Sequence, residues 1–332
     1  MRAYILLLFI LFAGCDNFFE PEPANDPQAI FDNLWQEFSA LYGPFEERNV
    51  DWDALRSKYR PMVSSSTSEE ELYTILTSML AELDDGHVRL TTPGKEIYHS
   101  NRVFREKTDD ELFNEALIKD NYLDEGYVDK SSYLYGTIQR DVIYLRLKAI
   151  DDQALILDKV LDQFSDSKGL IIDLRHGRGG DFTWAFDAFS RLTNEKRLVF
   201  SSKTRNGPDR NDFTHWYDWY LEPEGKFFDK PIFVLTDRYT LSASERAAMA
   251  LKVLPKATLV GDTTSGGHST VIGRELQNSW YYSISTQKTR FMDGKSYEGI
   301  GVIPEVPLRN SRANMAAGTD DVLQYAVINI TR

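Results

Sequence analysis

Two short motifs, far apart in the sequence, contain the residue types that a serine hydrolase needs. One is TLSASE at residues 240–245, at a predicted junction of a strand and a helix, and the other is LDDGH at residues 83–87, where an earlier predicted helix ends. If the fold brings the two motifs together, the Ser242 hydroxyl attacks a carbonyl carbon and the His87 imidazole takes the hydroxyl proton.

Ser242 also has a plain structural interpretation. The sequence SASE at residues 242–245 has the form of a capping box, and most serines in that pattern only cap a helix. The position has chemical value all the same, because the free N–H groups and the dipole at a helix N-terminus stabilise a developing oxyanion. A nucleophile can occupy the cap, so the two interpretations do not exclude each other.

The general base has two main candidates among the five histidines of the chain. His87 ends an amphipathic helix, where a histidine commonly interacts with the helix dipole without any catalytic role. His268 lies in a glycine-rich stretch and is the rival base. No pair of histidines has convincing zinc spacing, and we expect neither a metal nor a cofactor.

Two further segments contain groups that a hydrolase uses. The segment DLRHGRGGD at residues 173–181 follows a predicted buried strand, and the N–H groups of Gly179 and Gly180 are suited to bind an oxyanion. It lacks the Gly-Lys-Ser/Thr ending of a phosphate loop, and an ordinary strand-to-helix turn is the alternative. In YEGIGVIPE at residues 297–305, the Glu298 carboxylate can orient a histidine, or it is an exposed loop side chain.

The elements that must position these residues follow from local patterns. Asp26-Pro27 predicts a helix start, and the capping-box pattern TSEE at residues 67–70 predicts another. Strands rich in Ile, Val and Leu alternate with helices after residue 141, which indicates a largely parallel α/β core. The predicted core strands are 142–145, 169–174, 198–201, 231–236 and 257–260, and the predicted helices are 51–59, 182–192 and 244–254.

The N-terminus has the pattern of a bacterial lipoprotein signal. A positive start precedes an apolar run at residues 4–12 that is too short to span a bilayer comfortably, and LFAGC at residues 11–15 resembles a lipidation motif. Cys15 is the only cysteine, so it has no partner for an intramolecular disulfide, and we expect it to be lipidated. The alternative is an uncleaved anchor with an incidental cysteine. The expected location is the bacterial cell envelope, facing the periplasm or the cell exterior.

The chain is predicted to have five parts. They are a signal peptide at 1–14, an acidic tether at 15–26, an N-terminal helical subdomain at 27–90, a connecting segment at 91–136, and an α/β catalytic core at 137–332. With 38 basic and 51 acidic residues the formal charge is −13, which argues against non-specific nucleic-acid binding.

Taken in order, the motifs resemble the tail-specific (carboxyl-terminal processing) serine peptidase family, and its tricorn-protease core branch in particular. The resemblance spans roughly residues 27–310. The matching segments are VDWD at 50–53, LDDGH at 83–87, LIIDLR through the Gly-Gly pair at 170–180, SASE at 242–245, VGDTT at 260–264 and EGIGVIP at 298–304.

The resemblance implies a fold and a set of roles. The fold would be a crotonase/ClpP-like α/β spiral core with an N-terminal helical cap subdomain. Ser242 would be the nucleophile, His87 the general base, and Glu298 the residue that orients the base side of the network. The oxyanion hole would be formed by the backbone N–H groups of Ala243 and of Gly179 or Gly180.

The chain departs from the family pattern at three places. Better-known members use a lysine 25 residues after the serine, where this chain has Gly267, so a lysine mechanism is not expected. Tricorn-type sites have a serine immediately before the histidine, where this chain has Gly86. Residues 91–136 are too short for the PDZ domain of the processing peptidases, so recognition of a peptide C-terminus by such a domain is not implied.

Three functions remain open from the sequence. The leading one is a membrane-tethered serine endopeptidase of the envelope that cleaves peptides or loosely folded proteins. The second is a catalytically silent module of the same fold that binds apolar ligands, and the third is a crotonase-like acyl-thioester enzyme that binds coenzyme A.

Overall fold

The computed structural model describes residues 25–332 of the protein. The predicted signal peptide, Cys15 and nearly all of the predicted tether lie outside the described residues. Within residues 25–332, no helix combines the length and the apolar character needed to cross a bilayer.

Three helices form the N-terminal part of the fold: α1 (Pro27–Leu41), α2 (Trp52–Tyr59) and α3 (Glu69–Ala81). As predicted, the Asp26 side chain caps α1 by accepting two backbone N–H groups, and proline occupies the first turn. The capping box of α3 uses Ser68 and Glu71, one residue later than the 67–70 pattern indicated, because the Ser68 hydroxyl accepts the N–H of Glu71 (3.3 Å).

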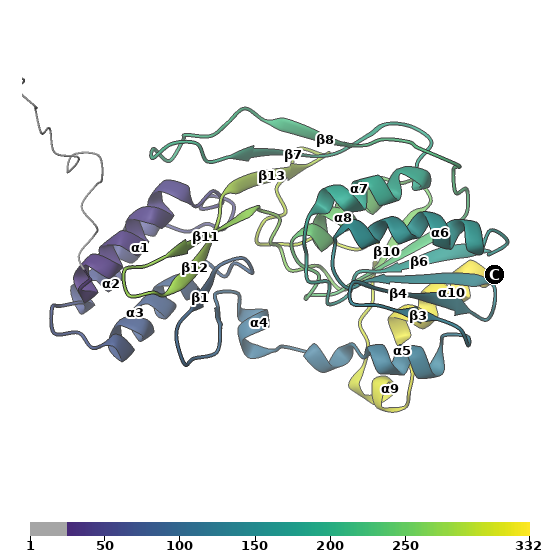
Figure 1. Cartoon of the computed structure of the whole chain (residues 1–332), viewed down its shortest axis with the longest axis horizontal. Helices are drawn as coiled ribbons and strands as arrows, with labels where there is room; N and C mark the ends of the chain where they lie inside the picture. Colours follow the sequence, from purple (N-terminus) through teal and green to yellow (C-terminus); the bar gives the residue numbers. More distant parts are fainter. Residues whose placement is uncertain (1–24) are drawn as a thin grey trace, which may run out of the picture.

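A four-stranded sheet in the order β11-β12-β1-β2 packs against these helices. Its strands are β1 (Arg89–Thr91), β2 (Tyr98–His99), β11 (Val271–Glu275) and β12 (Tyr281–Ser285). Trp280, Tyr282 and Ile284 are buried with the apolar side chains of the helices. The helices and this sheet, which we name the cap, therefore include a hairpin from late in the sequence that the predicted range 27–90 lacks (Figure 1).

The segment 91–136 is divided between the cap and the core. It contains α4 (Arg102–Glu106), α5 (Glu115–Asn121), β3 (Val128–Asp129) and part of β4 (Tyr133–Ile138). Its β2 belongs to the cap sheet, while β3 and β4 belong to the large sheet of the core, so these strands form no sheet of their own. The core sheet thus begins before the predicted boundary at residue 137.

The core is built on a seven-stranded sheet in the order β14-β10-β9-β6-β5-β4-β3. Besides β3 and β4, its strands are β5 (Val142–Leu147), β6 (Gly169–Asp173), β9 (Ile232–Thr236), β10 (Ala257–Gly261) and β14 (Val306–Pro307). Pairing is parallel from β14 to β5 and antiparallel from β5 to β3. The predicted α/β core with an N-terminal helical cap is confirmed.

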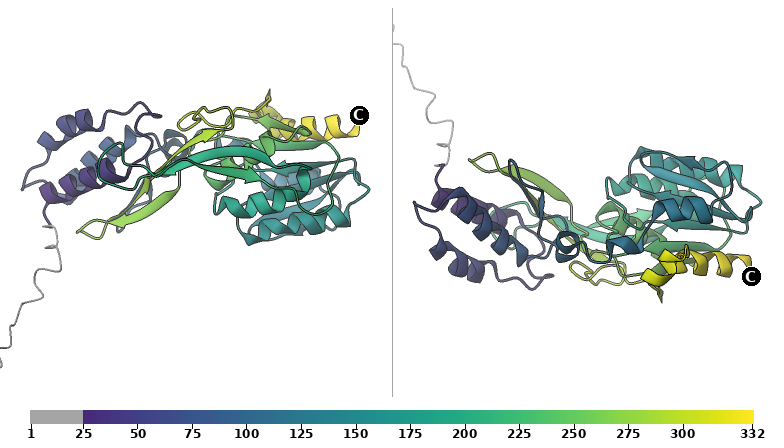
Figure 2. Two further views of the ribbon diagram at one scale, coloured as in Figure 1. Left: turned by 90° about the horizontal axis from the view of Figure 1, so that it is seen from above. Right: turned by 90° about the horizontal axis from the view of Figure 1, so that it is seen from below.

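Helices cover both faces of the large sheet. On one face lie α6 (Ile156–Gln163), α7 (Phe182–Ala188) and α8 (Ala243–Lys252), whose apolar side chains share one buried cluster with the sheet. On the other face lies α10 (Asp321–Thr331), preceded by the short α9 (Arg312–Ala316). Figure 2 shows the sheet between these two layers, with the cap at one end of the molecule.

A third sheet links the cap to the core. It consists of β7 (Arg197–Thr204), β8 (Tyr217–Leu221) and β13 (Gln287–Phe291) in the order β13-β7-β8. Phe200 of β7 is buried in the core cluster, while the guanidinium of Arg205, which follows β7, donates to the Ala40 carbonyl of α1 (2.6 Å). The sheet therefore holds the cap in a defined position over the core (Figure 1).

A buried ion network fixes the loop that follows β6. Arg175 is 2% exposed and pairs with Asp173 (2.6 Å) and with Asp320 at the start of α10 (2.8 Å), both fully buried. Buried charges persist where they are paired and hydrogen-bonded. The network thereby anchors the first part of the glycine-rich loop at the carboxyl ends of the parallel strands, where α/β sheets commonly bind ligands.

Candidate active site

Ser242 lies at the sharp turn between β9 and α8. Its backbone has φ 64° and ψ −125°, a conformation that costs free energy for a residue with a side chain and persists where the surrounding structure enforces it. The Ser242 N–H donates to the Gly267 carbonyl (3.2 Å) and contacts the Glu245 carboxylate (3.3 Å). Its hydroxyl makes no hydrogen bond to another described side chain, so it remains available for chemistry.

The predicted oxyanion donors surround this turn. A Cβ atom at Gly179 would lie 2.8 Å from the Ser242 Cβ and 3.1 Å from its Oγ, so only glycine lets the loop after β6 come this close. Among the described residues, the N–H groups of Gly179, Gly180 and Ala243 donate to no acceptor. Free N–H groups beside a serine at a helix N-terminus form an arrangement that stabilises an oxyanion.

His87 lies in the turn between α3 and β1 and is 5% exposed. Neither ring nitrogen has a hydrogen-bond partner among the described residues. A Cβ atom at Gly267 would lie 3.4 Å from the His87 Nδ1, and the Gly267 carbonyl accepts the N–H of Ser242. The fold therefore brings His87 and Ser242 against the same glycine, although 155 residues separate them.

Asp85 is a buried carboxylate near His87 that the sequence analysis did not select. Its Oδ1 accepts the His87 N–H (2.8 Å) and lies 4.0 Å from the His87 Nδ1. Its Oδ2 accepts the hydroxyls of Tyr42 (2.9 Å) and Ser285 (2.7 Å). These bonds fix the carboxylate where it favours an imidazolium formed on His87. The Asp-x-His spacing was the signal available in the sequence.

Glu298 lies behind this layer and contacts partners that the sequence could not name. Its Oε1 accepts the Arg48 guanidinium (2.7 Å), and its Oε2 accepts the N–H of His268 (2.9 Å). Although burial opposes ionisation, Arg48 and His268 hold the pKa of Glu298 at about 2. Glu298 is therefore an ionised support that directly contacts His268 and Arg48 rather than His87.

His268, the rival base, is fully buried between two carboxylates. Its Nε2 lies 3.4 Å from Glu245 and its Nδ1 lies 3.7 Å from Glu298. Burial alone would lower the pKa of His268, but the two carboxylates outweigh it and raise the pKa. A raised pKa favours the protonated form of His268, and a protonated, fully buried ring cannot accept a proton from Ser242.

This chain has Gly86 where tricorn-type sites have a serine before the histidine, and another hydroxyl lies beside that position. A Cβ atom at Gly86 would lie 2.7 Å from a methyl group of Leu241 and 3.3 Å from the Ser265 Oγ. The Ser265 hydroxyl is buried and has no hydrogen-bond partner among the described residues. A hydroxyl from a different segment thus lies beside the place where a side chain at residue 86 would begin.

The burial of His87 predicts that kcat/KM falls on the acid side with a pKa below the ordinary histidine value of about 6.5. Burial lowers the pKa of His87, and the smaller opposing effect of Asp85 does not reverse this shift. The base is active when neutral, so kcat/KM should be retained below pH ~6.5 and should fall as the pH drops through the lowered pKa. Measurement of kcat/KM between about pH 4 and pH 8 checks this prediction. An acid limb with a pKa above ~6.5 would instead point to His268.

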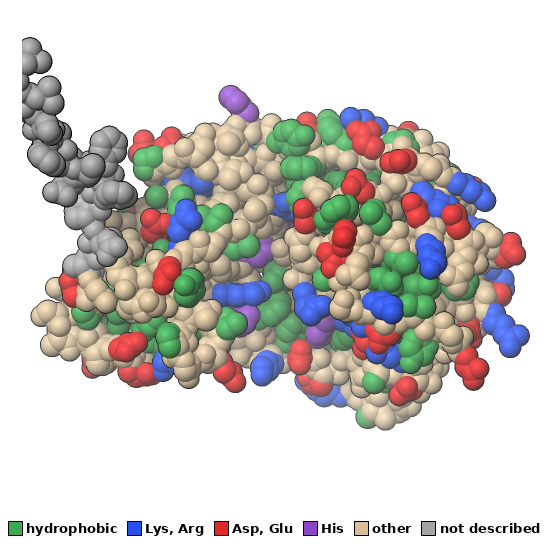
Figure 3. All heavy atoms as spheres, viewed as in Figure 1, with side chains coloured by type: hydrophobic (Ala, Val, Ile, Leu, Met, Phe, Trp, Pro, Cys, Tyr) green, Lys and Arg blue, Asp and Glu red, His purple; other side chains and the backbone are tan. Residues whose placement is uncertain are grey.

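The candidate site is built from both the cap and the core. In the space-filling view, histidine side chains reach the surface around a hollow between the two parts (Figure 3). His87 comes from the cap side, whereas Ser242 and the glycine loop come from the core. Docking of the cap on the core is therefore what assembles the site.

Comparison with known proteins decides the family. The profile described as Peptidase family S41 matches residues 141–308, just over half of the chain. The chain belongs to peptidase family S41. A second profile, the Tricorn protease C1 domain, matches residues 23–81. The S41 match contains Ser242, Glu298 and the glycine loop, and His87 lies between the two matched ranges.

Relatives and solved structures agree with this membership. A carboxy-terminal-processing protease of Bartonella bacilliformis is 29% identical over 194 residues, which are 56% of this S41 chain and 43% of the relative. The chain thus spans less than half of that relative's length. A candidate peptidase from Parabacteroides merdae superposes with a TM-score of 0.83 at 26% identity, covering 93% of this chain and 98% of that one.

Two more distant structures share the fold. Mature CPAF has a TM-score of 0.70 at 11% identity, covering 91% of this chain and 96% of its own. The tricorn protease has a TM-score of 0.57 at 14% identity, covering 92% of this chain and 36% of its own. At these identities the likeness concerns the S41 fold alone.

Proposed function

We propose that the protein is a serine endopeptidase that hydrolyses peptide bonds through an acyl-enzyme on Ser242, with His87 as the general base. Membership of peptidase family S41 supports the reaction class. The observation that carries the residue assignment is the shared contact with Gly267, whose carbonyl accepts the Ser242 N–H and whose Cα faces the His87 ring.

The proposed reaction has two halves. The Ser242 Oγ attacks the scissile carbonyl carbon as His87 accepts the hydroxyl proton, and the N–H groups of Gly179, Gly180 and Ala243 receive the oxyanion. Collapse of the tetrahedral intermediate breaks the C–N bond, and His87 returns the proton to the leaving amine. A water molecule, deprotonated by His87, then attacks the acyl-enzyme and releases the second product.

Asp85 and Glu298 support this chemistry as positioning residues. Asp85 fixes the backbone of His87 and faces its ring, so it stabilises the imidazolium of the intermediate. Glu298 holds Arg48, and Arg48 in turn donates to the Asp84 carbonyl (2.8 Å) and pairs with Asp85 (3.5 Å). Removal of either carboxylate would therefore disturb His87 through the intervening contacts.

We also propose that Cys15 carries a lipid that attaches the peptidase to a membrane of the bacterial envelope, where it cleaves peptides or loosely folded proteins. The support is the LFAGC sequence that precedes an acidic tether. Metabolic labelling with a fatty-acid analogue tests this proposal, and a Cys15→Ala protein that incorporates the same label would contradict it.

Covalent labelling tests the proposed nucleophile directly. A fluorescent serine-directed phosphonate should label the folded protein at Ser242, because only an activated serine reacts at a useful rate. The measurement is gel fluorescence followed by peptide mapping, with heat-denatured protein as the control. A folded protein that resists the probe would instead favour the silent binding module.

A further inference from the structure

Arg89, two residues beyond His87, is a half-buried cation without a partner. Its guanidinium donates no hydrogen bond, lies near no carboxylate and stacks on no aromatic ring among the described residues, and its Nε is fully buried. Burial lowers the pKa of Arg89, and no neighbouring carboxylate offsets the shift. A cation that is partly removed from water without a partner costs free energy, so its position is suited to receive an anion.

The register of the cap sheet places Arg89 on the face opposite the cap helices. Leu90, its neighbour in β1, is buried in the cap cluster, and side chains alternate along a strand, so Arg89 faces the other way. The Ser283 hydroxyl accepts the Arg89 N–H (3.2 Å) and donates to the His87 carbonyl (2.5 Å). This contact ties the turn that contains His87 to the start of β1, where Arg89 lies.

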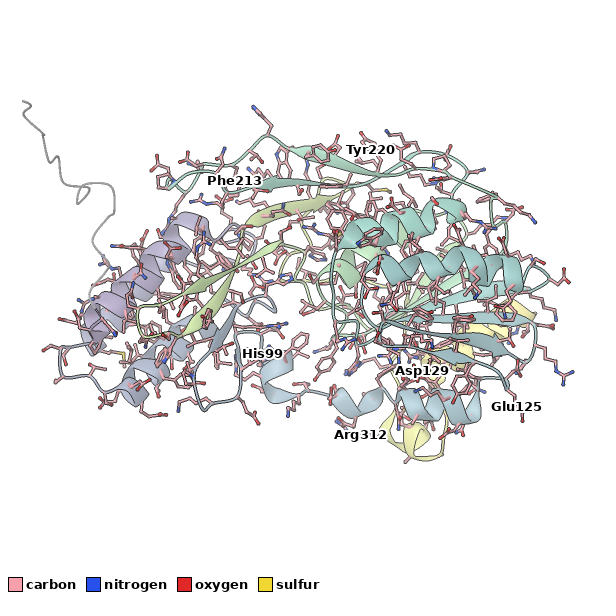
Figure 4. All side chains as sticks on the ribbon, viewed as in Figure 1. His99, Glu125, Asp129, Phe213, Tyr220 and Arg312 are labelled. Carbon is pink, nitrogen blue, oxygen red and sulfur yellow. The ribbon has the colours of Figure 1, made fainter. Side chains whose placement is uncertain are left out.

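His99 lies directly opposite Arg89 in β2 and extends this surface toward the core. Its Nδ1 is buried without a hydrogen-bond partner among the described residues. The ring stacks on Phe104 (5.9 Å), which packs edge-on against Tyr239 (5.1 Å), three residues before Ser242. Figure 4 shows His99 between the cap and the core. The unpartnered Arg89 thus belongs to a surface that leads to the nucleophile.

We propose that Arg89 binds a carboxylate of the peptide substrate, so that the enzyme prefers substrates with a carboxylate close to the cleaved bond. The inference rests on the proposed peptidase function. Arginine suits this role because its planar guanidinium matches a carboxylate with two parallel hydrogen bonds. His99 supplies a second polar group beside it.

The distance from the catalytic base limits where this carboxylate lies in the substrate. His87 lies in the turn before β1 and Arg89 is the first residue of β1, so only two chain steps join them and their Cα atoms are at most about 7 Å apart. A bound peptide in extended conformation covers a similar distance in two residues. The carboxylate is therefore the C-terminus of a short leaving peptide, or an Asp or Glu side chain within about two or three residues of the cleaved bond.

Peptide binding to the Ser242→Ala protein tests the inference without turnover. The probes are fluorescein-labelled degenerate octapeptides in matched pairs: a free C-terminus against an amidated one, and amidated pools with Glu against pools with Gln. We expect at least one carboxylate pool to bind about tenfold more tightly than its neutral twin by fluorescence anisotropy, because charged hydrogen bonds are the stronger ones. The first pair reports the chain terminus and the second reports an acidic side chain.

Adding Arg89→Gln to the Ser242→Ala protein should make the members of each pair bind equally, while Arg89→Lys should leave an intermediate preference. The matched control is Arg140→Gln, which removes the same charge from the exposed turn that joins β4 to β5. Thermal unfolding verifies that each variant is folded. Three results would each overturn the inference. The Ser242→Ala protein with Arg89 intact binds the carboxylate and neutral pools equally, the preference for carboxylate pools survives Arg89→Gln, or no peptide binds.

The peptide-binding test and the phosphonate test can fail independently, so the role of Arg89 and the peptidase assignment are judged separately. If the phosphonate fails to label Ser242 but the Arg89-dependent preference is present, the peptidase assignment fails and carboxylate binding stands. If Ser242 is labelled and the twins bind equally, the peptidase assignment stands and the role of Arg89 is rejected.

Discussion

Replacement of Ser242 by alanine should abolish peptide hydrolysis while the protein stays folded. Loss of a serine nucleophile removes the covalent route, and in enzymes of this kind it lowers kcat by about 10⁴-fold or more. Alanine keeps the Cβ atom that packs against Gly179, and the Ser242 hydroxyl bonds to no other described side chain, so stability should change little. The measurement is the initial rate on a casein or peptide-pool substrate.

The control for Ser242→Ala is Ser66→Ala, which removes a hydroxyl from an exposed loop before α3. Both variants should unfold near the temperature of the parent protein, and only Ser242→Ala should lose activity and phosphonate labelling. Hydrolysis by Ser242→Ala within about tenfold of the parent would rule out the acyl-enzyme on this residue, because oxyanion binding alone sustains a far smaller rate.

Replacement of His87 by alanine should lower kcat by about 10³-fold or more, because His87 is the proposed base and faces Gly267, which bonds the Ser242 N–H. His268→Gln should have a smaller effect, since His268 is enclosed by Glu245 and Glu298 and its loss acts through their displacement. Steady-state rates of the two variants, each checked for folding by circular dichroism, distinguish the candidates.

Added imidazole sharpens the comparison of the two histidines. His87 is 5% exposed, so the space left by His87→Ala should admit imidazole and regain part of the rate. His268 is fully buried, and imidazole should not restore a variant at that position. Near-full activity in His87→Ala, or imidazole rescue only at residue 268, would transfer the role of base to His268.

Much of the fold could be predicted because its signals are local. The cap of α1, the buried strands 169–173 and 232–236, and the helix after Ser242 each follow from capping residues or apolar periodicity within a few residues. The prediction of the cap differed from the structure because pairing between strands far apart in the sequence leaves no local signal. The β11–β12 hairpin joins the cap through pairing with β1, and no local pattern specifies a strand partner that distant.

The candidate site likewise has residues that local motifs identify and contacts that only the structure shows. Ser242, His87 and the glycine pair were identified from motifs, since each motif is a continuous segment with a recognisable local geometry. The partners of Glu298 were not predictable, because Arg48 lies 250 residues away and meets it only when the cap docks on the core. Asp85 could have been noticed from its spacing to His87, but Tyr42 and Ser285, which fix its carboxylate, come from distant segments.

The sequence by itself indicated the family, the turn that holds Ser242 and the absence of a lysine 25 residues after that serine, because each of these depends on the order of residues along short segments. Only the tertiary structure decided which carboxylates support which histidine, and that Arg89 is left without a partner beside His87. The Arg48–Glu298 contact behind these histidines joins segments 250 residues apart. Such contacts depend on strand register and on the packing of cap against core, which set distances of a few ångströms that no local pattern encodes.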